Sequence, residues 1–237
     1  MDVILIPGFW LDASSWDPVV PALAAAGHRM HPLTLPGRES PDAARTGITL
    51  RSEVDAAVRV IDSLDASLGP VALVGHSGGG AVAHAALDRR PARVARVVYV
   101  DSGPLPEGMP INDKLPVVDG EIPLPDWSVL GEEDLTDLDD DLRADFRRRA
   151  VPIPAGVATE PQAALVDPRR YDVPVTVIAC GAPAAMYQEW MSEGVPLLSE
   201  LARIKDVTWV DLPTGHWPQF TRPAELAEVL VQSVGAA

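Results

Sequence analysis

Short apolar runs rich in β-branched residues recur along this chain, and turns rich in glycine or proline end most of them. Segments long enough for helices separate the runs. Apolar runs of this kind are typical of strands buried on both faces, and strands separated by helices imply right-handed crossovers in a parallel sheet. We therefore predict an α/β fold, with a mostly parallel sheet flanked by helices. The predicted strands are Val3–Ile6, His31–Leu35, Val71–Val74, Val94–Val100, Val173–Ala179 and Val207–Leu212.

The segments between these runs carry helix signals. Apolar residues from Leu50 to Leu68 recur at spacings of three and four, which places them on one face of a helix. Gly27 lies where a C-terminal cap is expected for a helix over Ser15–Ala26. Further helices are predicted from about Gly78 to Arg89, within Met186–Ile204, and from about Pro223 onwards.

The alternation of strand and helix signals stops between Pro104 and about Tyr171. The chain there is rich in proline and acidic residues and has no strong strand signal. One helix is well marked there, because aspartates from Asp139 begin it and arginines up to Arg149 end it, matching the helix macrodipole. The chain has 237 residues and 47% hydrophobic composition, which suits one α/β domain. We predict a single domain over residues 1–237, with a helical lid inserted at about residues 104–171.

The charge balance excludes several classes of partner. The chain has 19 Lys and Arg residues against 34 Asp and Glu residues, a formal net charge of −15. Such acidity repels phosphates and anionic membranes, so we expect a small-molecule substrate and neither nucleic acid nor a membrane as partner. The acidic run Glu132–Asp145 lacks the alternating acids around a glycine that a calcium loop has, and is expected to be solvated lid surface. No metal and no cofactor is predicted, and the oligomeric state stays open.

The sequence also bears on the compartment. The first ten residues, MDVILIPGFW, contain an acidic residue and no basic one, unlike a signal peptide. No apolar run approaches the ~20 residues needed to span a bilayer. Cys180 is the one cysteine, so an intramolecular disulfide cannot form, which suits a reducing environment. We therefore expect a cytoplasmic protein.

The sequence Gly75-His76-Ser77-Gly78-Gly79 fits the pattern G-x-S-x-G. The pattern is weak alone, but an apolar strand precedes it and a helix follows, as a nucleophile elbow requires. Ser77 Oγ is then expected above the sheet edge, at the N-terminus of the helix. The alternative is a glycine-rich connection or a phosphate loop, although the Lys-Ser/Thr ending and the G-x-G-x-x-G spacing are both missing.

A serine hydroxyl is a weak nucleophile and needs a general base. His216 is the best candidate, because it follows the last strand and the expected chain order is serine, acid, histidine. His28 and His31 flank the second strand and are expected at the surface. His84 is expected to pack within its helix, and His76 is expected to point away from Ser77.

Taken together, these residues make the sequence resemble an α/β-hydrolase-fold enzyme, among the small esterases related to plant methylesterases and hydroxynitrile lyases. The resemblance covers nearly the whole chain apart from the lid, and it rests on the elbow and on two further motifs. These are Pro7-Gly8-Phe9-Trp10, with Trp16 in the next helix, and Gly215-His216-Trp217-Pro218. The resemblance implies an oxyanion hole made by the backbone amides of Gly78 and Phe9.

The acid of the triad departs from the family's pattern. The family usually places it just after the penultimate strand, where this chain reads Ala179 to Ala185 without a carboxylate. Asp101, at the tip of the strand after the elbow helix, can take its place, because the carboxylate need only orient the imidazole and stabilise its protonated form. A turn-capping role for Asp101 and a degraded triad are the alternatives, and Glu189 and Asp211 are weaker candidates.

Comparison with enzymes of the same fold limits the reactions that this chain is expected to catalyse. A serine nucleophile excludes the dehalogenases and epoxide hydrolases of this fold, which use aspartate. Trp217 stands where hydroxynitrile lyases have a lysine, and Gly78 where perhydrolase-like members usually have methionine. We therefore expect a serine hydrolase that cleaves a small, largely apolar carboxylic ester, thioester or lactone through an acyl-enzyme. A weakly catalytic small-molecule-binding protein and a C–C bond hydrolase are the alternatives.

Aromatic residues are the candidates for an apolar substrate pocket. Trp10, Trp217 and Trp127 are predicted to bind substrate, and Phe9 and Trp190 are further candidates, while core packing is the alternative for each.

Overall fold

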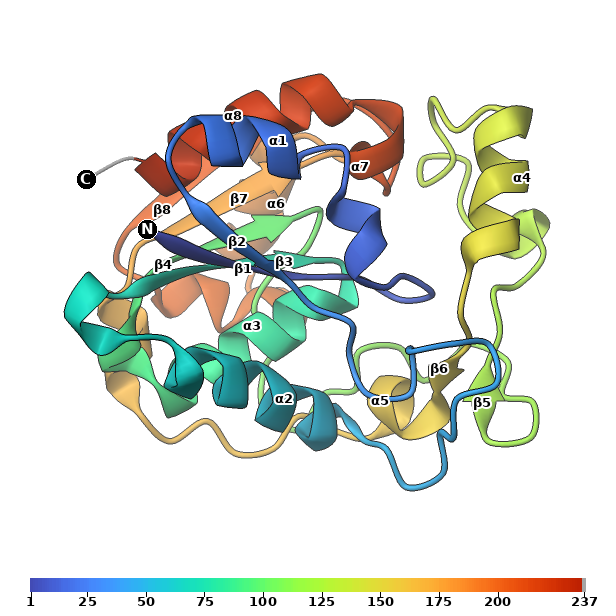
Figure 1. The fold of residues 1–237 in the computed structure, drawn as a ribbon, viewed down its shortest axis with the longest axis horizontal. Coiled ribbons are helices and arrows are strands. Elements are labelled where there is room, and N and C mark those ends of the chain that lie inside the picture. Colours follow the sequence, from blue (N-terminus) through green and yellow to red (C-terminus); the bar gives the residue numbers. More distant parts are fainter. Residues whose placement is uncertain (236–237) are drawn as a thin grey trace.

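The structure is a computed structural model that describes residues 1–235. A six-stranded sheet lies at its centre, with the strand order β2-β1-β3-β4-β7-β8 (Figure 1). Every pairing within it is parallel, which confirms the predicted fold class. The strands are β1 (Asp2–Ile6), β2 (Arg29–Pro32), β3 (Val71–His76), β4 (Val94–Val100), β7 (Val175–Ala179) and β8 (Val207–Asp211).

Helices cover both faces of this sheet. In Figure 1, α2 (Leu50–Ser63) and α3 (Gly78–Arg89) lie on one side, and α1 (Val20–Ala25) and α8 (Pro223–Gly235) lie together on the other. Two shorter helices, α6 (Ala184–Ser192) and α7 (Pro218–Thr221), follow β7 and β8. Within residues 1–235, no helix is both long enough and apolar enough to cross a membrane.

The alternation of side chains along each strand creates two apolar cores. In β1, Ile4 and Ile6 pack into the cluster that includes the apolar side chains of α2 and α3. Val3 and Leu5 point to the opposite face and pack with Leu23 and the apolar face of α8. Successive residues of a strand face opposite sides of a sheet, so a strand with helices over both faces must be apolar throughout.

Several sequence-based boundaries differ from the structure, and three of these differences have a clear local reason. The predicted helix over Ser15–Ala26 is a 3₁₀ turn, Ala13–Trp16, followed by α1; Pro18 separates the two, and Pro21 lies in the first turn of α1. The second strand begins two residues and ends three residues earlier than predicted, because the pairing with β1 runs from Arg29 opposite Asp2 to Pro32 opposite Leu5. The helix from Leu50 ends at Ser63, and Leu68 lies in a separate, exposed 3₁₀ turn.

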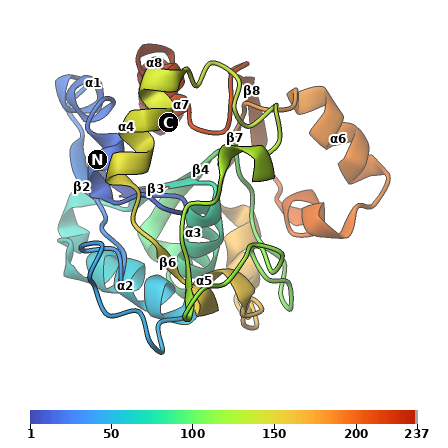
Figure 2. The ribbon, with the colours of Figure 1, turned by 90° about the vertical axis from the view of Figure 1, so that its right-hand side faces the viewer.

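The segment between β4 and β7 lies across the end of the sheet at which the strands finish (Figures 1 and 2). It includes the predicted helix, α4 (Asp140–Arg149), whose N-cap Asp139 accepts a hydrogen bond from the amide of Leu142. It also contains α5 (Ala155–Thr159) and a small antiparallel sheet that the sequence did not suggest, formed by β5 (Glu121–Ile122) and β6 (Ile153–Pro154). We call this segment, residues 104–171, the cap.

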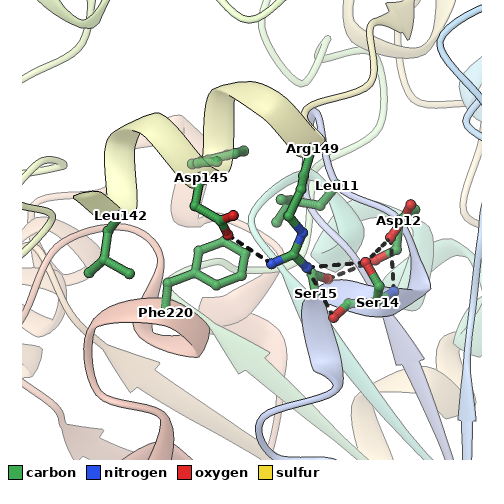
Figure 3. Close-up of a pocket in the computed structure, with 9 residues that line it drawn as sticks. Leu11, Asp12, Ser14, Ser15, Leu142, Asp145, Arg149 and Phe220 are labelled. Atoms are coloured by element: carbon green, nitrogen blue, oxygen red, sulfur yellow. Dashed lines mark hydrogen bonds and ion pairs between the residues drawn. The ribbon is translucent and has the colours of Figure 1, made fainter. Parts of the chain in front are cut away.

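The helix α4 lies against the loop after β1. Arg149 Nη2 donates to Ser14 Oγ at 3.2 Å, and Arg149 Nη1 pairs with Asp145 Oδ2 at 3.2 Å (Figure 3). The hollow between α4 and this loop has about 20 Å³ of free volume, which is no larger than a site for water. This contact therefore joins the cap to the sheet and is not a substrate site.

A buried ion pair also stabilises the loop that follows β1. Arg38 Nη2 lies 2.6 Å from Glu53 Oε1 of α2, and both side chains are only 1% exposed. Arg38 Nη1 donates to the carbonyl oxygen of Gly8 at 2.6 Å. A charge buried without a partner is strongly unfavourable, so the loop and α2 depend on each other through Arg38.

We expect Glu53→Gln to lower the free energy of unfolding by about 3–5 kcal/mol, because it leaves the Arg38 charge buried without a counterion. Urea denaturation followed by circular dichroism measures this change. Asp62→Asn is the matched control, since the pair Asp62–Arg90 is partly exposed and its loss should cost less than about 1 kcal/mol. Similar small losses in both variants would contradict the assignment of Arg38 to a desolvated pair.

Candidate active site

Ser77 occupies the sharp turn between β3 and α3. Its backbone has φ 51° and ψ −127°, a conformation that a residue with a side chain rarely adopts. The turn is tight because the first residues of α3 press against β1: a side-chain carbon at Gly79 would lie 2.5 Å from the carbonyl oxygen of Ile6. Such a strained, glycine-supported turn exposes the serine hydroxyl above the sheet edge, as in a nucleophile elbow.

Three side chains from distant parts of the sequence form a hydrogen-bonded chain at this edge. Ser77 Oγ lies 2.7 Å from His216 Nε2, and His216 Nδ1 lies 2.6 Å from Asp101 Oδ2. The carboxylate can only accept, so Nδ1 carries a proton and Nε2 of the neutral ring is free to accept from Ser77 Oγ. This is the geometry of a nucleophile, a general base and an orienting acid.

Asp101 comes from the strand next to the one on which the family usually places its acid. It follows β4 with φ 44°, and its Oδ1 accepts from the amides of Cys180 at 3.0 Å and Gly181 at 3.3 Å. Since β4 and β7 are neighbours, Asp101 reaches the end of β7, where the sequence lacks a carboxylate. Neither alternative acid contacts His216: Asp211 accepts from the amide of Ala184, and Glu189 is exposed in α6.

Electrostatics favours the protonated form of this histidine. Burial lowers the pKa of His216, but the hydrogen bond and charge of Asp101 outweigh burial and leave the pKa raised. Burial likewise raises the pKa of Asp101, but the hydrogen bond to His216 overcomes it and the net pKa is lowered. The pair would thus stabilise an imidazolium if His216 took a proton from Ser77.

Backbone contacts from the cap fix the loop that carries His216. The amide of His216 donates to the carbonyl oxygen of Asp134 at 2.9 Å. The amide of Gly215 donates to the carbonyl oxygen of Thr136 at 3.0 Å. Gly215 allows this approach, because a side-chain carbon there would lie 2.4 Å from the Asp134 oxygen. No motif in the sequence indicated this dependence on the cap.

His76 has a role that the sequence did not indicate. Its Nε2 lies 2.6 Å from the carbonyl oxygen of His216, so His76 donates a hydrogen bond to the loop that carries His216. Burial lowers the pKa of His76 to about 3, which keeps the ring neutral. His84 packs as expected: its two nitrogens contact Tyr99 Oη at 3.1 Å and Glu200 Oε2 at 3.0 Å.

The two predicted oxyanion donors lie on the wall of the same cavity as Ser77. The Phe9 ring packs so closely on Gly78 that a side-chain carbon at Gly78 would lie 2.6 Å from it. The amide of Gly78 is at the first position of α3, where an amide has no acceptor within the helix. This arrangement brings the loop after β1 beside the helix N-terminus, as a two-amide oxyanion hole requires.

A cavity of about 410 Å³ opens in front of Ser77. Its walls are mainly apolar and come from both the sheet end and the cap. Trp10 and Trp217 line it as predicted, and so does Phe9. Apart from the residues already described, the lining includes Leu105, Ile111, Asn112, Leu130, Asp134, Val177, Tyr187 and Leu201.

Two of the candidate pocket aromatics do not reach this cavity. Trp127 packs inside the cap, with its ring 5.7 Å from Phe146 and 6.2 Å from Trp217, and so does not fulfil the predicted substrate contact. Trp190 lies on α6 beside Tyr187. Tyr187 and Asp134 line the cavity but were not singled out, since Tyr187 lies in a helix and Asp134 in a run of acids. Within residues 1–235 no cluster of three His, Cys, Asp or Glu residues could hold a metal ion.

The comparisons with known proteins agree with this architecture. The sequence pattern of the alpha/beta hydrolase family matches residues 3–229. A pyrethroid hydrolase from Sphingobium wenxiniae is 26% identical over 254 residues, which cover 99% of this chain and 88% of that protein. An extracellular alpha/beta-hydrolase from a Paenibacillus species superposes with TM-score 0.75 at 19% identity, covering 100% of both chains. A methylesterase from Arabidopsis superposes with TM-score 0.73 at 16% identity, covering 99% of both.

We expect the His216 ring to titrate above the ordinary histidine pKa of about 6.5, because Asp101 stabilises its charged form. In Asp101→Asn this stabilisation is lost while burial remains, so the pKa should fall. NMR titration of the ring resonances measures both values, with His216→Gln identifying the signal. His76 serves as internal control and should stay neutral down to about pH 4. An unchanged His216 pKa in Asp101→Asn would contradict the pairing.

Proposed function

Because this chain belongs to the alpha/beta hydrolase family, we propose that it hydrolyses a small, largely apolar carboxylic ester, thioester or lactone with Ser77 as the nucleophile. The observation that carries this proposal is the hydrogen-bonded chain of Ser77, His216 and Asp101 at the mouth of an apolar cavity. The names of the pyrethroid hydrolase and the methylesterase are consistent with ester cleavage.

The proposed reaction begins with attack of Ser77 Oγ on the carbonyl carbon, while His216 Nε2 takes the hydroxyl proton. The amides of Phe9 and Gly78 stabilise the negative charge that develops on the carbonyl oxygen, and one such donor is typically worth ~3–4 kcal/mol. His216 then protonates the leaving group, which departs and leaves an acyl-enzyme. Water, activated by the same imidazole, releases the acid and restores Ser77.

The cavity supports a substrate of modest size. About 410 Å³ suits a small organic molecule, and the apolar walls favour hydrocarbon parts on the acyl or alcohol side. The alternative of a non-catalytic binding protein rested on the missing acid after β7. The contact of Asp101 with His216 and with the amides of Cys180 and Gly181 weakens that argument, because a carboxylate is available at this place.

A fluorophosphonate probe tests the nucleophile. We expect covalent labelling of the protein with one adduct on Ser77, since the probe reacts with an activated serine in an oxyanion hole. Intact-mass spectrometry and peptide mapping detect the adduct, and Ser77→Ala should abolish it. Ser63→Ala, which removes an exposed hydroxyl from α2, should label like the parent protein. A parent protein that stays unlabelled would favour the binding protein over the hydrolase.

The acid is tested by ester turnover. Asp101→Asn should reduce kcat for a p-nitrophenyl acyl ester by about 10⁴-fold, by analogy with the loss of the orienting acid in serine proteases. Circular dichroism should show an unchanged fold. Glu189→Gln is the matched control, because this alternative acid is exposed and lies away from His216. An unchanged rate in Asp101→Asn, or an equal loss in Glu189→Gln, would remove Asp101 from the triad.

A further inference from the structure

Asp134 is a carboxyl group on the wall of the proposed substrate cavity that the hydrolytic reaction does not use. It lies in the cap, before α4, and its backbone oxygen holds the amide of His216 at 2.9 Å. Its side chain is half-buried, unlike those of Glu132 and Glu133, the acids before it in the same run, which are exposed. The backbone contact thus holds this one acid of the run beside the active site.

The Asp134 carboxylate is compensated by the ring of His216 when that ring is charged, and by one backbone amide. Its Oδ2 accepts from the amide of Gly131 at 3.3 Å, and none of the ion pairs seen within residues 1–235 joins it to a lysine or arginine. Burial raises the pKa of Asp134. A partly desolvated carboxylate of this kind gains most from a positively charged group placed beside it.

The charge of Asp134 acts across the cavity. It contributes to the raised pKa of His216, and it adds a smaller effect to burial, Asp101 and Cys180, which raise the pKa of Tyr187 to about 12. His216, Tyr187 and Asp134 all line the cavity, so the Asp134 charge lies near the space that a substrate would occupy. Asp101 is the other acid on the lining, but His216 and two amides engage it.

Aromatic walls add a second feature that suits a cation. Trp10, Trp217 and Tyr187 line the same cavity as Asp134. The faces of such rings attract ammonium groups, most strongly where water is excluded. A carboxylate together with aromatic rings in an apolar pocket is a combination that recognises alkylammonium groups.

We propose that Asp134 is a specificity-determining residue that selects esters carrying an ammonium group over neutral esters of the same shape. This inference rests on the proposed ester hydrolysis, since it names the substrate class of the same cavity. The same carboxylate disfavours substrates that carry a carboxylate of their own, because like charges repel. Asp134 takes no part in proton transfer, and its effect on the His216 base applies equally to charged and neutral esters, so that effect cancels in the ratio of their rates.

The test compares two acetate esters that differ only in charge: acetylcholine and 3,3-dimethylbutyl acetate, in which carbon replaces the ammonium nitrogen. The ratio of their kcat/KM values is measured for the parent protein, Asp134→Asn and Glu132→Gln. We expect Asp134→Asn to lower the ratio by about tenfold, and moderate salt to lower it in the parent, since a screened charge pair is involved. The exposed Glu132→Gln should leave it nearly unchanged.

The two alcohols provide a measurement that does not depend on turnover. Binding of choline and of 3,3-dimethylbutanol to Ser77→Ala is measured by NMR titration, with and without Asp134→Asn. Preference for choline that disappears with Asp134→Asn supports the inference. Hydrolysis of both esters with a ratio insensitive to Asp134→Asn overturns the inference and leaves the proposed function intact. A choline preference without turnover of either ester, and without fluorophosphonate labelling, overturns the hydrolase and retains the cation recognition.

Discussion

The hydrogen bond between His216 Nδ1 and Asp101 Oδ2 is the interaction on which the rest of the site depends. It determines which nitrogen of the ring faces Ser77 and it stabilises the charged ring against burial. It forms because the strands are parallel, so that residues following β3, β4 and β8 all emerge at one edge of the sheet. The order of the strands thus brings three residues together that lie far apart in the chain.

The cap is part of this site and does more than cover it. Carbonyl oxygens of Asp134 and Thr136 accept the amides of the His216 loop, and His76 supports the loop from within the sheet. On the other side, Arg38 holds the carbonyl of Gly8 beside Phe9, and α4 contacts Ser14. A movement of the cap would therefore change the position of the His216 ring as well as the shape of the cavity mouth.

Much of the fold could be predicted from the sequence, since a strand covered on both faces must be apolar along its length. β4 is apolar apart from Arg96, and its predicted bounds match the structure. The predicted helix bounds were wrong where prolines interrupt an apolar pattern, as at Pro18 and Pro21. They were also wrong where an apolar residue, Leu68, matches the helical spacing but is exposed. At the site, Ser77 could be found from its motif, whereas the position of Asp134 on the cavity wall could not, because nothing in an acidic run shows which member turns inward.

The parallel sheet, the elbow and the family could all be read from the amino-acid sequence, because these follow from local apolar runs, small residues and turn chemistry. The three-dimensional arrangement was needed to show which carboxylate lies beside His216, which aromatic side chains line the cavity and which acid of the cap lies on its wall. Those outcomes depend on which strands are neighbours and on where the cap docks. Trp127 and Trp217 illustrate this, since both are aromatic and in contact, yet only Trp217 lines the cavity.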